Sequence, residues 1–227
     1  MINKIVDTIA EAMNGVSDGA TVLVGGFGAV GQPSALIEGL IAHGARDLTV
    51  VANNAGNAPD TGLGKLIKLG RVARMICSFP RGSPAFEELF RAGRIALEIT
   101  PQGTLAERLR AAGAGVPAFY TATAAGTKLA HGKEQREIDG RSYVLEKALY
   151  GDVALIEAWR ADRWGNLTYR ATGRNFNPVM AMAGKLTIAQ TQHVAELGEI
   201  DPEVIVTAGL FVDRVVHVPY GDPPRDP

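Results

Sequence analysis

The densest group of residues with chemical potential lies near the N-terminus, where residues 22–34 read VLVGGFGAVGQPS. A Gly-x-Gly-x-x-Gly spacing begins at Gly26, as in a dinucleotide-binding turn. Such a turn needs a strand before it, a helix after it, and an acidic residue about 20 positions further on that binds the ribose. Asn53 and Asn54 stand where that acid is needed, and Pro33 is unusual so soon after the last glycine. These departures disfavour a nicotinamide or flavin site.

Two other roles remain open for the same residues. One is a strand-to-helix turn that binds no ligand. The other is a close-approach loop, because glycine lets the backbone come near a ligand and a helix N-terminus offers unpaired N–H groups to an anion or a carbonyl oxygen. In that case Gly26, Phe27 and Gly28 would let the backbone approach an acyl thioester or a carboxylate without any dinucleotide.

Three amide side chains are candidates for stabilising negative charge. Gln102 lies in Pro-Gln-Gly-Thr at an expected strand-to-helix junction, and Asn53 and Asn54 end an expected buried strand. Attack on a thioester or an anhydride builds charge on oxygen, and preorganised N–H donors stabilise that charge. The plain alternatives are a surface glutamine and two asparagines that only end a strand.

The candidate nucleophiles are weak. Cys77 ends an expected strand with no paired histidine nearby, so we interpret it as a structural thiol. The four histidines lack metal-ligand spacing, so no metal site is expected. Most of the glutamates lie in expected amphipathic helices or at surface turns, where a solvated face explains them: Glu38, Glu87, Glu88, Glu107, Glu134 and Glu199.

The elements that must position these residues alternate between short apolar strands and amphipathic helices. This pattern predicts an α/β fold with an open, mostly parallel sheet flanked by helices. We expect a single domain over residues 1–227, with a disordered tail at about 221–227. The expected strands are 20–24, 47–54, 71–79, 95–100, 153–162, 186–191 and 203–209. The expected helices are 5–13, 33–45, 60–70, 83–93 and 175–184, with Asn175 as a cap. Residues 100–115 are expected to be a loop that opens a further helix. A hairpin is expected over 136–148, after an irregular segment at 118–134.

Composition narrows the class of protein. The 227 residues carry a net charge of −1, which gives no reason to expect a nucleic acid or a membrane surface as partner. No apolar run has the length of a membrane span. A single cysteine fits a reducing compartment, so a cytoplasmic location is expected.

Several stretches of the chain resemble the 3-oxoacid coenzyme A-transferases. Residues 18–33 follow the N-terminal signature of that family, D-G-x-x-V-L-V-G-G-F-x-x-x-G-x-P. The likeness covers nearly the whole chain and is greatest to the A (alpha) subunit of the bacterial two-subunit enzymes. The other matching stretches, in the same order, are 51–56, 77–83, 100–115, 162–170, 174–183 and 198–216.

This resemblance implies a reaction that moves coenzyme A from succinyl-CoA to a 3-oxo acid. It implies a glutamate nucleophile and a glutamyl-CoA thioester in ping-pong order, with the thioester as substrate and no cofactor. In the family the nucleophile lies in a Ser-Glu-Asn-Gly type motif on the B (beta) subunit, and this chain has no such motif. The chain is therefore expected to be inactive alone and to work with the beta subunit, in a hetero-oligomer such as A2B2. The resemblance also places Gln102, Asn53 and Asn54 at the acyl site.

The acceptor acid is less defined. Residues 136–146 and 162–170 resemble the 3-oxoadipate enzymes most, with acetoacetate as the runner-up. A second substrate carboxylate calls for a cation, and Arg81, Lys128 and Arg170 are candidates. Two other classes remain: a non-catalytic module that binds acyl-CoA or another ligand on the same scaffold, and a dinucleotide oxidoreductase.

Overall fold

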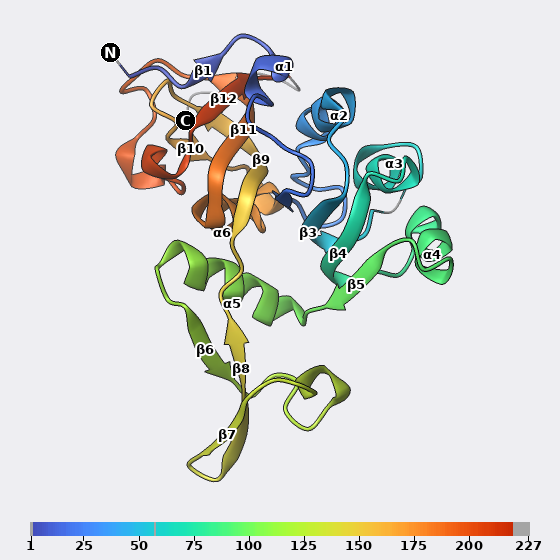
Figure 1. Ribbon diagram of the computed structural model, residues 1–227. Helices are drawn as coiled ribbons and strands as arrows, with labels where there is room; N and C mark the ends of the chain where they lie inside the picture. The colour runs from blue at the N-terminus through green and yellow to red at the C-terminus, as the bar shows by residue number, and fades with distance from the viewer. Residues whose placement is uncertain (1, 57, 220–227) are drawn as a thin grey trace.

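A computed structural model describes residues 2–56 and 58–219. Helices flank a nine-stranded sheet, and a second sheet of three strands extends away from it (Figure 1). The expected disordered tail at 221–227 lies outside the described residues.

The large sheet is almost entirely parallel. Its strands are β1 (Ile5–Val6), β2 (Thr21–Val24), β3 (Leu48–Asn54), β4 (Val72–Phe79), β5 (Ala96–Ile99), β9 (Gly151–Ala161), β10 (Leu167–Thr168), β11 (Gly184–Val194) and β12 (Arg214–His217). The order is β1-β12-β11-β9-β2-β3-β4-β5, with every neighbouring pair parallel, and only β10 pairs with β9 in the antiparallel sense. The prediction of an α/β fold with an open, mostly parallel sheet is confirmed.

The direction of chain growth reverses between β2 and β9. Strands β3, β4 and β5 follow one another outward from β2, whereas β11 and β12 are added on the far side of β9. In open parallel sheets, ligands bind outside the carboxyl ends of the strands where the order reverses. The glycine-rich stretch leaves β2 at this point.

Six α-helices in the described part of the chain cover the two faces of the sheet (Figure 1). One face packs against α1 (Ile9–Ala12), α2 (Ser34–His43), α3 (Gly62–Lys68) and α4 (Pro84–Arg91). The other packs against α5 (Gln102–Gly113) and α6 (Asn177–Ala183). Side chains alternate along β9, so Leu155 joins the first core and Ile156 the second. Within the described residues, no helix is long and apolar enough to span a membrane.

The three-stranded sheet forms an arm between α5 and β9. It consists of β6 (Ala118–Thr121), β7 (Gln135–Ile138) and β8 (Arg141–Lys147), with the short helix η1 (Lys128–Ala130) between its first two strands. Asp139 and Gly140 both have positive φ, as a two-residue type I′ hairpin turn requires, so the predicted hairpin is confirmed. The segment expected to be irregular contains the strand β6.

Arg108 ties this arm to the body. Its Nη1 donates to Glu98 Oε1 at 2.7 Å, and its Nε donates to the carbonyl of Lys147 at 2.9 Å. Burial would raise the pKa of Glu98, but the hydrogen bonds and charges of Arg108 and Arg74 outweigh burial and lower it. At the base of the arm, Arg108 on α5 is therefore joined to β5 by an ion pair and to β8 by a backbone hydrogen bond.

Two predicted elements are wrong. Residues 5–13 do not form one helix, because Ile5–Val6 pair with β12 and the helix begins only after Thr8, whose hydroxyl accepts from Glu11 N. Residues 203–209 are not a strand. Pro202 opens a 3₁₀ turn (η3, Pro202–Val204) capped by the Asp201 side chain, and the last strand is β12 instead.

The reactivity of the Cys77 thiol can test whether this residue is buried in the native core. Its side chain is buried at the carboxyl end of β4, and burial raises the pKa of its thiol to about 12. An ordinary cysteine has a pKa of about 8.5, and only the thiolate reacts with disulfide reagents. We therefore expect Ellman's reagent at pH 8 to modify the native protein at least about a thousandfold more slowly than the same protein in guanidinium. Equal rates in the two states would show that Cys77 is accessible in the native fold.

Candidate active site

The glycine-rich stretch folds as a tight hairpin. Phe27 N donates to Val30 O at 2.9 Å, and Val30 N donates back to Phe27 O at 3.2 Å. Gly28 is the first residue of the turn and has a φ of +63°, the conformation that favours glycine there. Phe27 and Val30 remain half exposed, at 54% and 50%. The glycines therefore build a turn that projects from the end of β2.

The helix that follows does not offer free N–H groups. Ala35 N and Leu36 N, in the first turn of α2, both donate to Gln190 Oε1 at 3.0 and 3.2 Å. A pyrophosphate at a helix N-terminus needs these donors unpaired. Because Gln190 occupies them, the geometry argues against a dinucleotide at this turn and against an anion bound by α2.

The three predicted amides do meet, in one chain of hydrogen bonds. Asn53 Nδ2 donates to Gln102 Oε1 at 2.9 Å, while Asn53 Oδ1 accepts from Asn54 Nδ2 at 3.2 Å and from Gly28 N at 3.3 Å. Asn54 Oδ1 in turn accepts from Gly56 N at 2.7 Å. We call Gly28, Asn53, Asn54 and Gln102 the amide chain. It joins the hairpin, the end of β3 and the start of α5.

The amide chain fixes which end of Gln102 is presented. Its Oε1 is occupied by Asn53, and within the described residues its Nε2 makes no hydrogen bond. Asn53 and Asn54 are each only 6% exposed, so they support Gln102 from inside. Gln102 is the first residue of α5 and is only partly buried. The arrangement can therefore offer one amide N–H donor to an oxygen that gains negative charge.

The other predicted residues are placed differently. Gly26 N donates to Asn175 Oδ1 at 3.1 Å, so it is part of the hairpin's support. Phe27 is exposed beside the turn.

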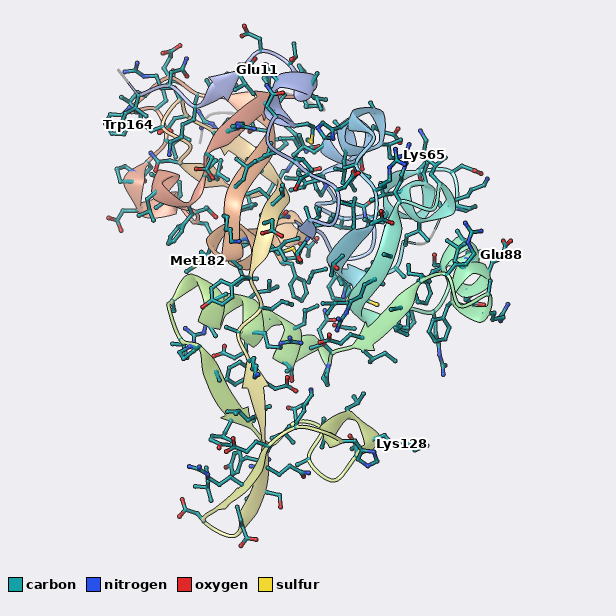
Figure 2. All side chains as sticks on the ribbon, in the orientation of Figure 1. Glu11, Lys65, Glu88, Lys128, Trp164 and Met182 are labelled. Carbon is teal, nitrogen blue, oxygen red and sulfur yellow. The ribbon has the colours of Figure 1, made fainter. Side chains whose placement is uncertain are left out.

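No member of the amide chain is a carboxylate, and five of the surface glutamates form ion pairs: Glu38 with Lys65, Glu87 with Arg91, Glu107 with Arg110, Glu134 with Arg136, and Glu199 with Arg160. Glu88 lies exposed on α4 (Figure 2).

The three candidate cations do not form a cluster. Arg170 lies over the ring of Trp159, with its Cζ 4.7 Å from the ring centroid, and both line a cavity beside the hairpin. Arg81 is exposed in the loop after β4, and Lys128 is exposed on the arm (Figure 2). Of the three, only Arg170 lines this cavity.

The same cavity contains a carboxyl group that sequence reasoning missed. Glu157, in the middle of β9, accepts from Gln190 Nε2 at 3.1 Å and from Gln192 Nε2 at 3.2 Å. Burial raises the pKa of Glu157, although these hydrogen bonds oppose the shift. Its position in the strand is the available signal, because alternation places it on the face of the core residues Val153 and Leu155.

Asn175 also has a role different from the one predicted. The N-cap of α6 is Phe176, with no side-chain cap bond, and the Asn175 amide turns toward the hairpin. Asn177 is fully buried and reaches the same loop. The prediction of Asn175 as a helix cap is wrong because the glycine-rich backbone offers it both an acceptor and a donor. Among residues 2–56 and 58–219, no group of three or more His, Cys, Asp or Glu side chains could hold a metal ion.

Comparison with known proteins agrees with this fold. A family model described as coenzyme A transferase matches residues 6–218. The chain is 60% identical over 220 residues to the A subunit of 3-oxoadipate CoA-transferase from Pseudomonas putida, covering 96% of this chain and 95% of that protein. It is 48% identical over 215 residues to the A subunit of a probable succinyl-CoA:3-ketoacid coenzyme A transferase from Bacillus subtilis, covering 95% and 90%.

Solved structures show the same architecture at lower identity. Glutaconate coenzyme A-transferase from Acidaminococcus fermentans has a TM-score of 0.82 at 22% identity, covering 96% of this chain and 76% of that chain. An acyl-CoA transferase from E. coli O157:H7 has a TM-score of 0.81 at 23% identity, and this chain spans 50% of its length with 96% of its own. A variant of the AibA/AibB decarboxylase has a TM-score of 0.80 at 28% identity, covering 96% and 84%. From the family model and the identity to its relatives, the chain belongs to the coenzyme A transferase family.

Proposed function

We propose that this chain is the alpha subunit of a two-subunit, cytoplasmic enzyme that moves coenzyme A from succinyl-CoA to 3-oxoadipate. The observation that carries the proposal is the amide chain, which contains no carboxylate and ends at Gln102 in an N–H donor that has no partner among the described residues. Such a site supplies a donor for the oxyanion but no nucleophile, so it provides only one of the two groups that a covalent mechanism needs. The relatives named as the A subunits of such transferases support the same division.

The reaction follows a ping-pong order, with the nucleophilic glutamate on the beta subunit. That carboxylate attacks the thioester carbonyl of succinyl-CoA and expels the CoA thiolate, which leaves a mixed anhydride. The thiolate then attacks the glutamyl carbonyl, releases succinate and forms the glutamyl-CoA thioester. The 3-oxo acid carboxylate attacks this thioester and expels the thiolate again, and attack of the thiolate on the new anhydride forms 3-oxoacyl-CoA and restores the glutamate. No cofactor takes part.

Gln102 acts at the tetrahedral stage of these steps. Each attack places negative charge on the former carbonyl oxygen, and a donor already aimed at that oxygen lowers the barrier without reorganising. Asn53 holds Gln102 in this orientation, because it occupies the Gln102 oxygen and leaves the nitrogen available, and Asn54 in turn holds Asn53. Gly28 completes the support through its N–H, and Gly26 and Phe27 shape the hairpin beside the acyl group.

The acceptor is proposed as 3-oxoadipate because a relative at 60% identity is named for that acid. The second carboxylate would meet Arg170, whose guanidinium lies at the cavity beside the hairpin. Acetoacetate is the runner-up, since other relatives are named for 3-ketoacids. A non-catalytic acyl-CoA or ligand-binding module is the remaining alternative.

Reconstitution tests the division between the two subunits. We expect the chain co-expressed with its beta subunit, in a complex such as A2B2, to form 3-oxoadipyl-CoA from succinyl-CoA and 3-oxoadipate, measured by chromatographic separation of the two CoA thioesters. The chain alone should give no turnover, because it supplies no nucleophile. Full activity of the isolated chain would contradict the half-enzyme assignment, and a preference for acetoacetate in the complex would change the acceptor.

Substitution at Gln102 tests the oxyanion donor. In the complex, Gln102→Ala should lower kcat/KM by about 100- to 1000-fold, as loss of one such donor does elsewhere. Gln102→Glu keeps an oxygen for Asn53 but has no donor when ionised, so it should lose as much or more. The matched control is Gln135→Ala on the exposed strand β7, which should leave kcat/KM unchanged. Wild-type kcat/KM in Gln102→Ala would remove Gln102 from the mechanism.

A further inference from the structure

Asn177 is buried completely and uses its whole amide to join three segments. Its Nδ2 donates to Gly31 O at 3.0 Å and to Gly173 O at 2.8 Å. Its Oδ1 accepts from Glu157 N at 3.0 Å. Asn177 therefore connects the end of the hairpin to β9 and to the turn before α6.

Asn175 holds the other part of the hairpin. Its Oδ1 accepts from Gly26 N at 3.1 Å, and its Nδ2 donates to Val30 O at 3.0 Å. These two backbone groups lie on opposite sides of the turn, where the chain enters and leaves it. One side chain thus spans both strands of the hairpin. We call Asn175 and Asn177 the asparagine clamp.

Two glycines leave the space that the clamp occupies. A Cβ at Gly25 would lie 1.8 Å from Asn177 Oδ1, and a Cβ at Gly31 would lie 2.4 Å from Gly173 O and 2.8 Å from Asn175 Nδ2. Real Cβ atoms do not approach other atoms so closely. Glycine at these two positions is therefore explained by the clamp, without any ligand.

We propose that Asn175 and Asn177 are positioning residues for the transferase reaction, which act through the hairpin on Gln102. The clamp fixes the backbone on both sides of Gly28, and Gly28 N donates to Asn53 Oδ1. Together with the bond from Asn54 Nδ2, that bond keeps Asn53 Nδ2 toward Gln102 Oε1. The inference rests on the proposed role of Gln102 as an N–H donor.

The hydrogen bond from Gly28 N to Asn53 Oδ1 is the longest between the clamp and Gln102, so it makes the orientation of Gln102 sensitive to the position of the hairpin. The distance from Gly28 N to Asn53 Oδ1 is 3.3 Å, at the long end for N–H···O bonds, so a small shift of the hairpin breaks it. The two ends of an amide have nearly the same shape, so only their hydrogen bonds decide which end faces a neighbour. Without the Gly28 N–H, the oxygen of Asn53 keeps only the 3.2 Å bond from Asn54 Nδ2, so the orientation of Asn53, and with it that of Gln102, is held less firmly.

The first test uses the complete complex of this chain with its beta subunit. Asn175 is only half-buried, so Asn175→Ala is the variant expected to fold, which a thermal melt would check. We expect kcat to fall by about 10- to 100-fold, since misplacement of a reacting group by about 1 Å has effects of this size, with KM within about threefold. Asn175→Asp keeps the acceptor for Gly26 N but has no donor for Val30 O, so it should recover part of kcat. A wild-type kcat in Asn175→Ala would overturn the proposal.

A double-mutant cycle then separates positioning from general damage. If the clamp acts through Gln102, adding Asn175→Ala to Gln102→Ala should change kcat by less than about threefold, because there is no donor left to misplace. Multiplied effects of the two substitutions would overturn the proposal. Unchanged activity in Gln102→Ala alone would instead refute the donor role on which it rests.

Asn166 is the matched control. It is also a half-buried asparagine that holds a turn, since its Nδ2 donates to Asp162 Oδ2 at 2.8 Å and its Oδ1 accepts from Gly209 N at 2.8 Å. Asn166→Ala should lower Tm and leave kcat unchanged. If it lowers kcat as much as Asn175→Ala at the same loss of Tm, the clamp supports only the fold.

Discussion

The hydrogen bond from Asn53 Nδ2 to Gln102 Oε1 is the contact on which the candidate site depends. It joins residues 49 positions apart in the sequence, one at the end of β3 and one at the start of α5. In a parallel sheet, the carboxyl ends of all strands lie at the same edge. The segment that follows one strand therefore begins close to the last residues of its neighbouring strands. This bond fixes the orientation of the Gln102 amide, because it occupies the oxygen and leaves the nitrogen without a hydrogen bond among the described residues.

The glycine-rich stretch also helps to orient Gln102, because Gly28 N donates to Asn53. At a reversal of strand order, a glycine-rich turn commonly receives a phosphate through free N–H groups. Here Gly26 and Gly28 donate to asparagine side chains, and Gln190 occupies the first turn of α2. The N–H groups of Gly26, Phe27, Gly28 and Val30 are thus occupied by the protein itself. A glycine-rich turn of similar sequence can therefore support a neighbouring site without binding the ligand. Which role it takes depends on whether its N–H groups donate to the ligand or to side chains of the protein.

Much of the fold could be predicted from the sequence, because strand and helix patterns are local. The errors lie where a distant contact decides: Ile5–Val6 become a strand only by pairing with β12. The amides Gln102, Asn53 and Asn54 could be singled out by their positions at strand ends, but not their order of donation. Asn175 and Asn177 looked like parts of a helix start, since nothing nearby in the sequence shows that they face residues 25–31. Glu157 was hidden for a similar reason, as its neighbours Gln190 and Gln192 lie on another strand.

The amide chain consists only of groups that do not titrate in water near neutral pH. Backbone N–H, asparagine and glutamine keep the same protons from acidic to alkaline solution. The direction of Gln102 is therefore set independently of proton concentration, unlike a donor whose direction depends on a histidine or a carboxyl group. Any pH dependence of the transfer step must then enter through the substrates, the nucleophile or more distant groups. Because the amide chain is uncharged at every working pH, only other groups, such as the substrates and the nucleophile that come into contact with it, can make the reaction depend on pH.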